Sequence, residues 1–205
     1  MNSIRAVTLI IVTLNLLSLG CGKAGGGFGH DMIARTGICD GYPDPATSPY
    51  VAPFSIGEKR TVGQGNCMGY SHYGAGRYAY DIGMPIGSDV VASRGGTVLA
   101  VEGGNEDGNG CPGDNHVYIK HTDGTVAKYV HLTKGGALVA VGELINQGQK
   151  IGLSGNTGCS SGPHLHFQVD RDDSLSDSMP VTFRNISGNP MGLQPNTEYL
   201  ALPYE

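Results

Sequence analysis

The sequence lacks four features that would point to common partners or architectures. It has no basic excess, because its formal net charge is −5 and its pI is about 5.7, which disfavours binding to nucleic acid or anionic lipid. Its early apolar stretch, residues 6–17, is too short to span a bilayer. After residue 25 it shows neither an internal repeat nor a long amphipathic helical pattern, so any helices should be short and peripheral.

Glycine and proline are abundant instead. The chain has 34 glycines and 11 prolines without a collagen repeat, which indicates many tight turns. Short apolar runs, such as "TVLAVE" and "VAKYVHL", lie between turn signals. In "HVYIKHTDGTVAKYVHL", Asp123 and Gly124 suit a type I′ turn between two strands. We therefore predict an all-β fold, an antiparallel β-sandwich or meander.

The beginning of the chain resembles an export signal. Arg5 precedes the apolar stretch at 6–17, as in a signal peptide. Cys21 follows a small residue and precedes a glycine-rich segment, which resembles the lipobox of bacterial lipoproteins; lipid attachment at Cys21 and simple cleavage both remain open. The predicted organisation is a signal peptide at 1–20, a Gly/Pro-rich tether at 22–47, one domain at 48–185 and a C-terminal tail at 186–205.

Export changes how the cysteines are interpreted. If Cys21 is an anchor, four cysteines remain for an oxidising compartment, which suggests two disulfides with three pairings open. We favour Cys39 with Cys67 and Cys111 with Cys159. No two cysteines are separated by two to four residues, so a thiolate zinc site is not indicated.

Two histidines lie one residue apart in "SSGPHLHFQV", which otherwise has the pattern of an apolar strand. Successive side chains of a strand point to opposite faces. His164, His166 and Gln168 should therefore share one face, and the apolar residues between them should enter the core. The two imidazoles would then lie within reach of one metal ion or one substrate group.

The same alternation applies to two other strands. In "RYAYDIGM", Asp81 alternates with apolar residues and should lie on a groove face. In "AKYVHL", Val130 and Leu132 are predicted to face the core, with Tyr129 and His131 on the other side. Three separate strands thus present Asp or His opposite their apolar residues, which packing alone does not require.

These residues resemble a known family. "SGNTGCSSGPHLHFQV", together with "YVHL" and "YDIGMPIGSDVVASRGGTV", is similar to the lysostaphin and LytM type of zinc metallopeptidases, which cut peptide bonds in bacterial cell walls. The resemblance covers about residues 48–170 and implies a groove lined by the zinc site. It implies that Asp81 and His166 bind zinc, with His131 and His164 beside the metal as acid–base and oxyanion groups.

The first zinc ligand needs a substitute. In much of the family it lies four residues before the Asp, and here that position is Arg77, which cannot bind a cation. The stretch "SHYGAGRYAYD" resembles a family variant with a longer glycine-containing loop, which makes His72 the ligand. Gly74 and Gly76 would let the chain turn back toward Asp81.

Three protein ligands and one open position suit a catalytic zinc ion, one per chain. Of His131 and His164, one would act as the base and the other as the oxyanion donor, and the sequence leaves the assignment open. Asn156 in "GNTG" and Tyr129 are candidates for substrate contacts, with a plain turn role and simple packing as their respective alternatives. His116 and His121 are expected to be surface or hydrogen-bonded strand residues.

The sequence therefore predicts a zinc-dependent endopeptidase that hydrolyses peptidoglycan peptide bonds outside the cytoplasm, in the cell envelope or secreted. The partner is a peptidoglycan peptide, with no nucleic acid, and membrane tethering would depend on lipidated Cys21. Two alternatives remain: a catalytically silent regulator of cell-wall hydrolases that keeps the fold, and a cell-wall binding module.

Overall fold

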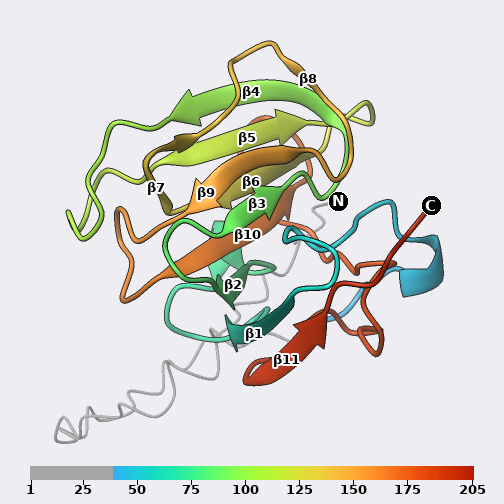
Figure 1. Ribbon diagram of the computed structural model, residues 1–205. Helices are drawn as coiled ribbons and strands as arrows, with labels where there is room; N and C mark the ends of the chain where they lie inside the picture. Colours follow the sequence, from blue (N-terminus) through green and yellow to red (C-terminus); the bar gives the residue numbers. More distant parts are fainter. Residues whose placement is uncertain (1–38) are drawn as a thin grey trace, which may run out of the picture.

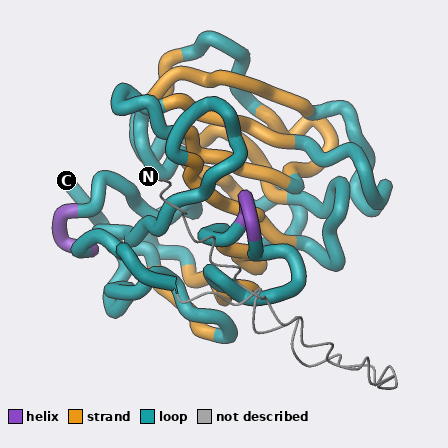
Figure 2. The backbone as a smooth tube through the Cα atoms, turned by 180° about the vertical axis from the view of Figure 1, so that it is seen from behind, coloured by secondary structure: helices purple, strands orange, loops and turns teal. Residues whose placement is uncertain are grey.

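The computed structural model describes residues 39–205. The predicted signal peptide, Cys21 and most of the predicted tether lie outside these residues. Two 3-10 turns and eleven strands form the described part (Figures 1 and 2): η1 (Pro45–Thr47), β1 (Lys59–Gln64), η2 (Gly74–Gly76), β2 (Tyr80–Gly83), β3 (Asp89–Val91), β4 (Gly96–Glu102), β5 (His116–Lys120), β6 (Val126–Val130), β7 (Leu132–Ala137), β8 (Leu144–Ile145), β9 (Lys150–Ser154), β10 (His164–Asp170) and β11 (Thr197–Leu200).

The strands form two antiparallel sheets, so the predicted all-β class is confirmed. The large sheet has the order β11-β1-β2-β10-β6-β5-β4-β8, and the small sheet has the order β3-β9-β7. In Figure 1 the small sheet lies in front of the centre of the large one. Only β4, β5 and β6 form a meander, because β10 comes from late in the chain and lies between β2 and β6.

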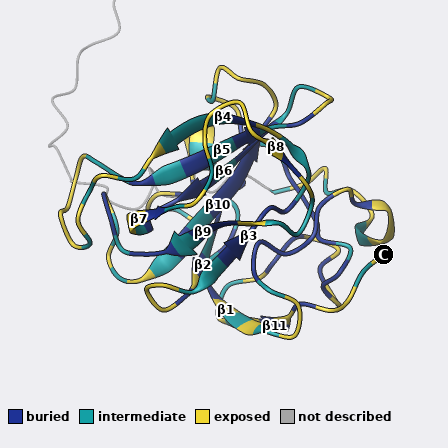
Figure 3. Ribbon diagram, turned by 45° about the horizontal axis from the view of Figure 1, so that its top comes forward, coloured by how far each residue is buried: buried dark blue, intermediate teal, exposed yellow. Residues whose placement is uncertain are grey.

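The core lies between the two sheets. Phe167 and Ile82 of the large sheet and Ile151 of the small sheet belong to one buried apolar cluster, and Figure 3 shows the central strands as the most buried part of the molecule. Burial of a large apolar side chain contributes about 1.5–3 kcal/mol, so this shared layer fixes the position of the two sheets. The opposite face of the large sheet is left for the site.

The segment predicted to be a surface tail is part of the fold, which corrects that expectation. β11 pairs with β1, with Lys59 opposite Leu200. Leu193 is 1% exposed and Tyr199 is 7% exposed, and both belong to the core cluster. Just before this segment, residues 180–183 form no strand, but Val181 and Phe183 are fully buried.

The predicted hairpin is formed, with a different turn. β5 and β6 pair antiparallel, with Lys120 opposite Val126. The Gly124 N–H donates to His121 O, and of Asp123 and Gly124 only Gly124 has a positive φ, of 90°. A type I′ turn needs positive φ at both central residues, whereas a three-residue loop ends on one left-handed glycine. The loop therefore spans 122–124 and replaces the predicted two-residue turn.

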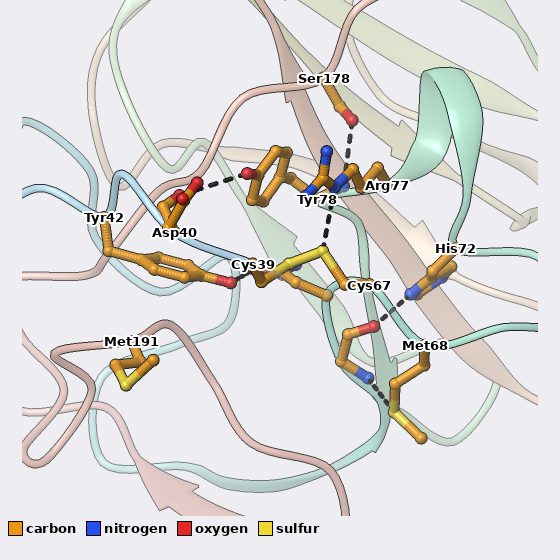
Figure 4. The surroundings of a disulfide bond; sticks show 12 residues. Cys39, Asp40, Tyr42, Cys67, Met68, His72, Arg77, Tyr78, Ser178 and Met191 are labelled. Carbon is orange, nitrogen blue, oxygen red and sulfur yellow. Dashed lines mark hydrogen bonds between the residues drawn. A yellow bond between two sulfur atoms is a disulfide. The ribbon is translucent and has the colours of Figure 1, made fainter. Parts of the chain in front are cut away.

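Two disulfides connect Cys39 with Cys67 and Cys111 with Cys159. This is the pairing that the sequence favoured. Figure 4 shows the first of them beside the loop that carries His72. Within residues 39–205, no helix has the length and apolar character needed to cross a bilayer.

Candidate metal centre

β10 presents the two histidines as predicted. Leu165 and Phe167 are fully buried in the core, and His164 and His166 lie on the opposite face with partial exposure. Gln168 shares that face and is 4% exposed. A regular strand at the centre of the large sheet thus holds both imidazoles in a fixed register.

Asp81 comes from the neighbouring strand β2. It lies directly opposite His166 in the antiparallel pair, and its Oδ1 atom is 2.9 Å from His166 Nδ1. Tyr80 and Ile82, on either side of Asp81, are fully buried. The alternation along β2 therefore directs the carboxylate to the face that carries His166, as predicted.

His72 comes from the loop between β1 and β2 and is fully buried. Its Nδ1–H donates to Gly65 O at 2.7 Å (Figure 4), and its Nε2 is 3.2 Å from Asp81 Oδ1. Gly74 has a φ of 55°, a left-handed conformation that glycine adopts without strain. The loop can therefore reverse between His72 and Asp81, and the structure brings the two residues together.

The orientation of these groups directs lone pairs toward one point. His72 donates through Nδ1, so in the neutral ring Nε2 carries a lone pair, and this buried atom has no hydrogen-bond partner. His166 Nε2 lies 3.1 Å from the side-chain amide oxygen of Gln168. Because that oxygen only accepts hydrogen bonds, Nε2 must donate to it, and Nδ1 carries the lone pair of the neutral ring. Two imidazole acceptors and one carboxylate oxygen thus face one another.

This donor set fits a zinc ion. In residues 39–205, His72, Asp81 and His166 are the one group of three or more potential ligands whose atoms all lie within 4.8 Å of one another. Three acceptors at this separation repel one another unless a cation or protons lie between them. Two imidazoles and a carboxylate are a known set for catalytic zinc, which keeps a further position open.

The charge on Asp81 is secured by its neighbours. Burial alone would raise the pKa of Asp81, but without a metal ion the imidazoles of His164, His166 and His72 can each place a proton between the ring and the carboxylate, and these protons hold this pKa well below its usual range. The carboxylate therefore stays ionised and supplies the negative charge that a divalent cation needs.

His131 and His164 lie beside this group, with ring centroids 4.7 Å apart. The Nδ1–H of His131 donates to Thr157 O at 2.7 Å, which leaves Nε2 as an acceptor. Burial, with the nearby His164 and His166, lowers the pKa of His131 to about 4. Burial would also lower the pKa of His164, but the hydrogen bond and charge of Asp81 outweigh it and raise that pKa.

Along β6 the predicted faces are reversed, which corrects the expectation that Tyr129 contacts substrate. Tyr129 is fully buried in the core, and its hydroxyl accepts a hydrogen bond from Ser93 N–H at 2.8 Å. Val130 lines the groove instead. His131 still reaches the groove because its φ of 66° interrupts the alternation between β6 and β7.

The site lies in a groove of about 430 Å³ on the outer face of the large sheet. Strands β1, β2, β10, β6 and β5 form its floor, and the loops before β2 and before β10 form its walls. The lining residues are Gln64, Tyr70, Ser71, Asp81, Tyr118, Lys128, Val130, His131, Cys159, Ser161, His164, His166 and Gln168.

Asn156 is not among these lining residues. Its backbone N–H donates to Asp107 Oδ1 at 2.6 Å, and its side-chain oxygen accepts a hydrogen bond from Ser160 at 2.7 Å. These bonds hold the loop that precedes β10. The structure thus supports the turn role that was left open for Asn156, and its substrate contact stays a prediction.

The sequence analysis missed Lys128 and Tyr70 as groove residues. Lys128 could have been found once Tyr129 was assigned to the core, because neighbours on a strand face opposite ways. Tyr70 is 93% exposed and has a φ of 94°, an outlier for a bulky residue. No local pattern in the sequence signals such a conformation.

The other two described histidines lie outside the group, as expected. His116 bonds Asp114 Oδ1 through Nδ1 at 2.7 Å and stacks on Tyr118. His121 is 3% exposed, and its Nδ1–H donates to Gly95 O at 2.9 Å. Both are hydrogen-bonded residues at the ends of β5.

Comparison with known proteins covers the part of the chain that carries most of these residues. The model of "Peptidase family M23" matches residues 75–178, half of the chain. The match includes Asp81, His131, His164 and His166, and it begins three residues after His72.

Curated relatives match over part of their length. The peptidoglycan DD-endopeptidase ShyA of Vibrio cholerae is 40% identical over 89 residues, which are 43% of this chain and 19% of that protein. Lysostaphin of Staphylococcus staphylolyticus is 37% identical over 128 residues, 58% of this chain and 25% of that protein. The chain thus matches about a quarter or less of the length of these relatives.

Among solved structures, the catalytic domain of the antimicrobial peptidase lysostaphin from Staphylococcus simulans is similar. Its sequence is 30% identical, the alignment covers 60% of this chain and 87% of that one, and the TM-score is 0.45.

Proposed function

Because the chain belongs to peptidase family M23, we propose that it is a zinc-dependent endopeptidase that hydrolyses peptide bonds of peptidoglycan outside the cytoplasm. The observation that carries the proposal is the convergence of His72 Nε2, Asp81 Oδ1 and His166 Nδ1. Each imidazole donates its N–H to an oxygen behind it and offers its lone pair forward. These three residues would hold the metal ion.

A bound zinc ion would supply a water with a pKa near 7 and would polarise the scissile carbonyl. The protein groups around it would accept the proton of the water and stabilise the developing oxyanion. His131 is kept neutral by burial and by its histidine neighbours, which lower its pKa to about 4. Its free Nε2 can accept a proton from the attacking water, as a general base does.

His164 is suited to the complementary role. Its Nδ1–H is held by Gly162 O at 2.8 Å, and its raised pKa, which Asp81 sustains against burial, favours a proton on Nε2. That N–H can donate to the oxygen on which negative charge develops. The two histidines that the sequence left unassigned thus separate into a base, His131, and an oxyanion donor, His164.

The groove supports a peptide as substrate. Its floor is a sheet face and loops form its walls, and the proposal is that an extended peptide binds along this floor. Peptidoglycan is the polymer named for ShyA, and we extend it to this chain as part of the proposal. Action on peptidoglycan would place the enzyme in the cell envelope or outside the cell. The export signal predicted from the sequence is consistent with this location.

The test combines metal binding with product analysis. We expect the purified protein to bind one Zn²⁺ per chain and to release muropeptides from sacculi, and a chelator should abolish the release. His72→Ala should weaken Zn²⁺ binding by more than the 10–100-fold that loss of an outer hydrogen-bond partner costs, and turnover should fall with it. His116→Ala, which removes an imidazole outside the group, is the matched control.

The outcomes separate the alternatives. Zinc binding without muropeptide release would contradict the proposal and favour a catalytically silent regulator. Sedimentation with sacculi that survives chelation and leaves the wall intact would favour a binding module. Equal zinc affinity in wild type and His72→Ala would remove His72 from the ligand set.

A further inference from the structure

Gln168 connects the candidate ligand His166 to a buried ion pair that the proposed mechanism does not use. It lies two residues after His166 on β10 and is 4% exposed. Its side-chain oxygen is 3.1 Å from His166 Nε2. Its amide nitrogen donates to Asp170 Oδ1 at 2.8 Å.

The orientation of the Gln168 amide is determined by Asp170. An ionised carboxylate only accepts hydrogen bonds, so the NH₂ group must face it and the oxygen must face His166. An amide flipped by 180° would set its oxygen against the carboxylate and its nitrogen against the imidazole N–H. Gln168 can therefore act toward His166 only as an acceptor.

Asp170 is held in place as a charged group. It is fully buried, and its Oδ2 is 2.8 Å from the ammonium of Lys128 on the adjacent strand β6. Lys128 also donates to Leu175 O at 3.2 Å. A buried carboxylate without such a partner would be costly, so Lys128 stabilises the charge that orients Gln168.

The interactions of these four side chains converge on Asp170. His166 donates to Gln168 and Gln168 donates to Asp170, whose other oxygen forms an ion pair with the Lys128 ammonium. We propose that Gln168 is a positioning residue: it holds the proton of His166 on Nε2 and so keeps the Nδ1 lone pair directed at the metal position beside Asp81. The inference rests on the proposed function, because it concerns how tightly the site holds zinc.

The alternative is that Gln168 only fills space in the floor of the groove. Packing would tolerate any side chain of similar shape, whereas positioning requires an acceptor next to His166. Outer partners of this kind typically change metal affinity by about 10–100-fold. The affinity of the protein for Zn²⁺ itself is therefore the decisive measurement.

The experiment compares Zn²⁺ dissociation constants, measured by competition with a chelator on the full chain. Gln168→Met keeps the shape and removes the acceptor, and Gln168→Asn keeps a polar group that is too short to reach both neighbours. The double variant Gln168→Glu/Asp170→Asn keeps the acceptor for His166 and the net charge while exchanging the two functional groups. Gln147→Met is the matched control, because that amide also both accepts and donates hydrogen bonds, from Arg184 and to the carbonyl oxygens of Pro49 and Ser93, but does not line the groove.

We expect Gln168→Met and Gln168→Asn to bind Zn²⁺ about 10–100-fold more weakly than wild type. Gln147→Met and the double variant should stay within about threefold. The unfolding midpoint of each zinc-free variant monitors folding, so that a loss of structure is not mistaken for a loss of affinity.

Wild-type affinity in both single variants would overturn the inference, and so would a double variant as weak as Gln168→Met. These results leave the proposed function intact, since wild type would still bind zinc. A wild-type protein that fails to bind Zn²⁺ would overturn both.

Discussion

At the scale of single residues, the backbone at His131 decides which groups reach the groove. Its φ of 66° lies in a region that only glycine and, less often, asparagine or aspartate adopt with little strain. The deviation occurs where β6 ends and β7 begins, and it turns the imidazole toward His164. Strained residues of this kind cluster at functional sites.

This conformation makes asparagine the informative replacement for His131. His131→Asn should keep the left-handed backbone and remove the imidazole. We expect turnover to fall by about 10²–10⁴-fold, the usual contribution of general acid–base catalysis, with zinc content unchanged. Kinetics and metal analysis on one preparation measure both. Turnover within tenfold of wild type would exclude His131 as the base.

His121 should make stability depend on pH far from the groove. Burial, opposed by its hydrogen bond to Gly95, lowers the pKa of His121 from 6.5 to about 4. The unfolded chain therefore takes up this proton first as the pH falls. Stability is fully present above about pH 6.5 and is lost toward pH 4, by about 2–3 kcal/mol near pH 4.5.

His121→Gln should remove this pH dependence while keeping a donor for Gly95. The measurement is the free energy of unfolding of both proteins at about pH 7 and pH 4.5, taken as the difference between them so that other groups cancel. A difference that does not change with pH would contradict the assignment.

Residue by residue, the sequence predicted what regular strands determine and missed what irregular backbone determines. The faces of His164, His166 and Asp81 follow from the two-residue period of β10 and β2, and they were predicted correctly. Tyr129 was assigned to the wrong face because the prediction continued the two-residue alternation of the strand through His131. The strand ends before His131, so the two residues need not share a face. A left-handed histidine gives no signal in composition or alternation.

At the scale of elements, the same limit appears in strand pairing. The β5–β6 hairpin was predictable because its two strands are close in sequence and joined by a turn. The pairing of β1 with β11 joins the first and last strands of the described chain, with Arg60 opposite Tyr199. Such a contact depends on the rest of the fold being formed, so β11 was mistaken for a tail.

β11 should therefore contribute measurably to stability. Tyr199 is 7% exposed, and its hydroxyl accepts a hydrogen bond from Gln194 N–H at 2.8 Å. We expect Tyr199→Ala to lower the free energy of unfolding by about 3 kcal/mol. Leu200→Ala, at a neighbouring position that is 39% exposed, should cost less than about 1 kcal/mol. Chemical denaturation tests the contrast, and equal losses would contradict the packing of β11.

At the scale of the whole molecule, the two disulfides flank the groove and act on different parts of it. Cys67 lies in the loop that carries His72, and its backbone N–H donates to Arg77 O at 2.7 Å. Cys159 lies two residues after Thr157, whose carbonyl holds His131. The cysteines of the two bonds are separated by 28 and 48 residues in the sequence. Closing loops of this length restricts the unfolded chain, so each bond should stabilise the fold by about 3–4 kcal/mol.

Removing each bond should therefore have a different functional effect. Cys39→Ser/Cys67→Ser frees the His72 loop and should weaken Zn²⁺ affinity by about tenfold or more, the scale of lost support around a metal ligand. Cys111→Ser/Cys159→Ser frees the loop that orients His131 and should lower turnover at saturating Zn²⁺ with little change in affinity. Both variants should unfold at lower temperature than wild type. Zinc titration and steady-state kinetics separate the two effects, and identical profiles for the two variants would show that the disulfides stabilise the fold without positioning separate parts of the groove.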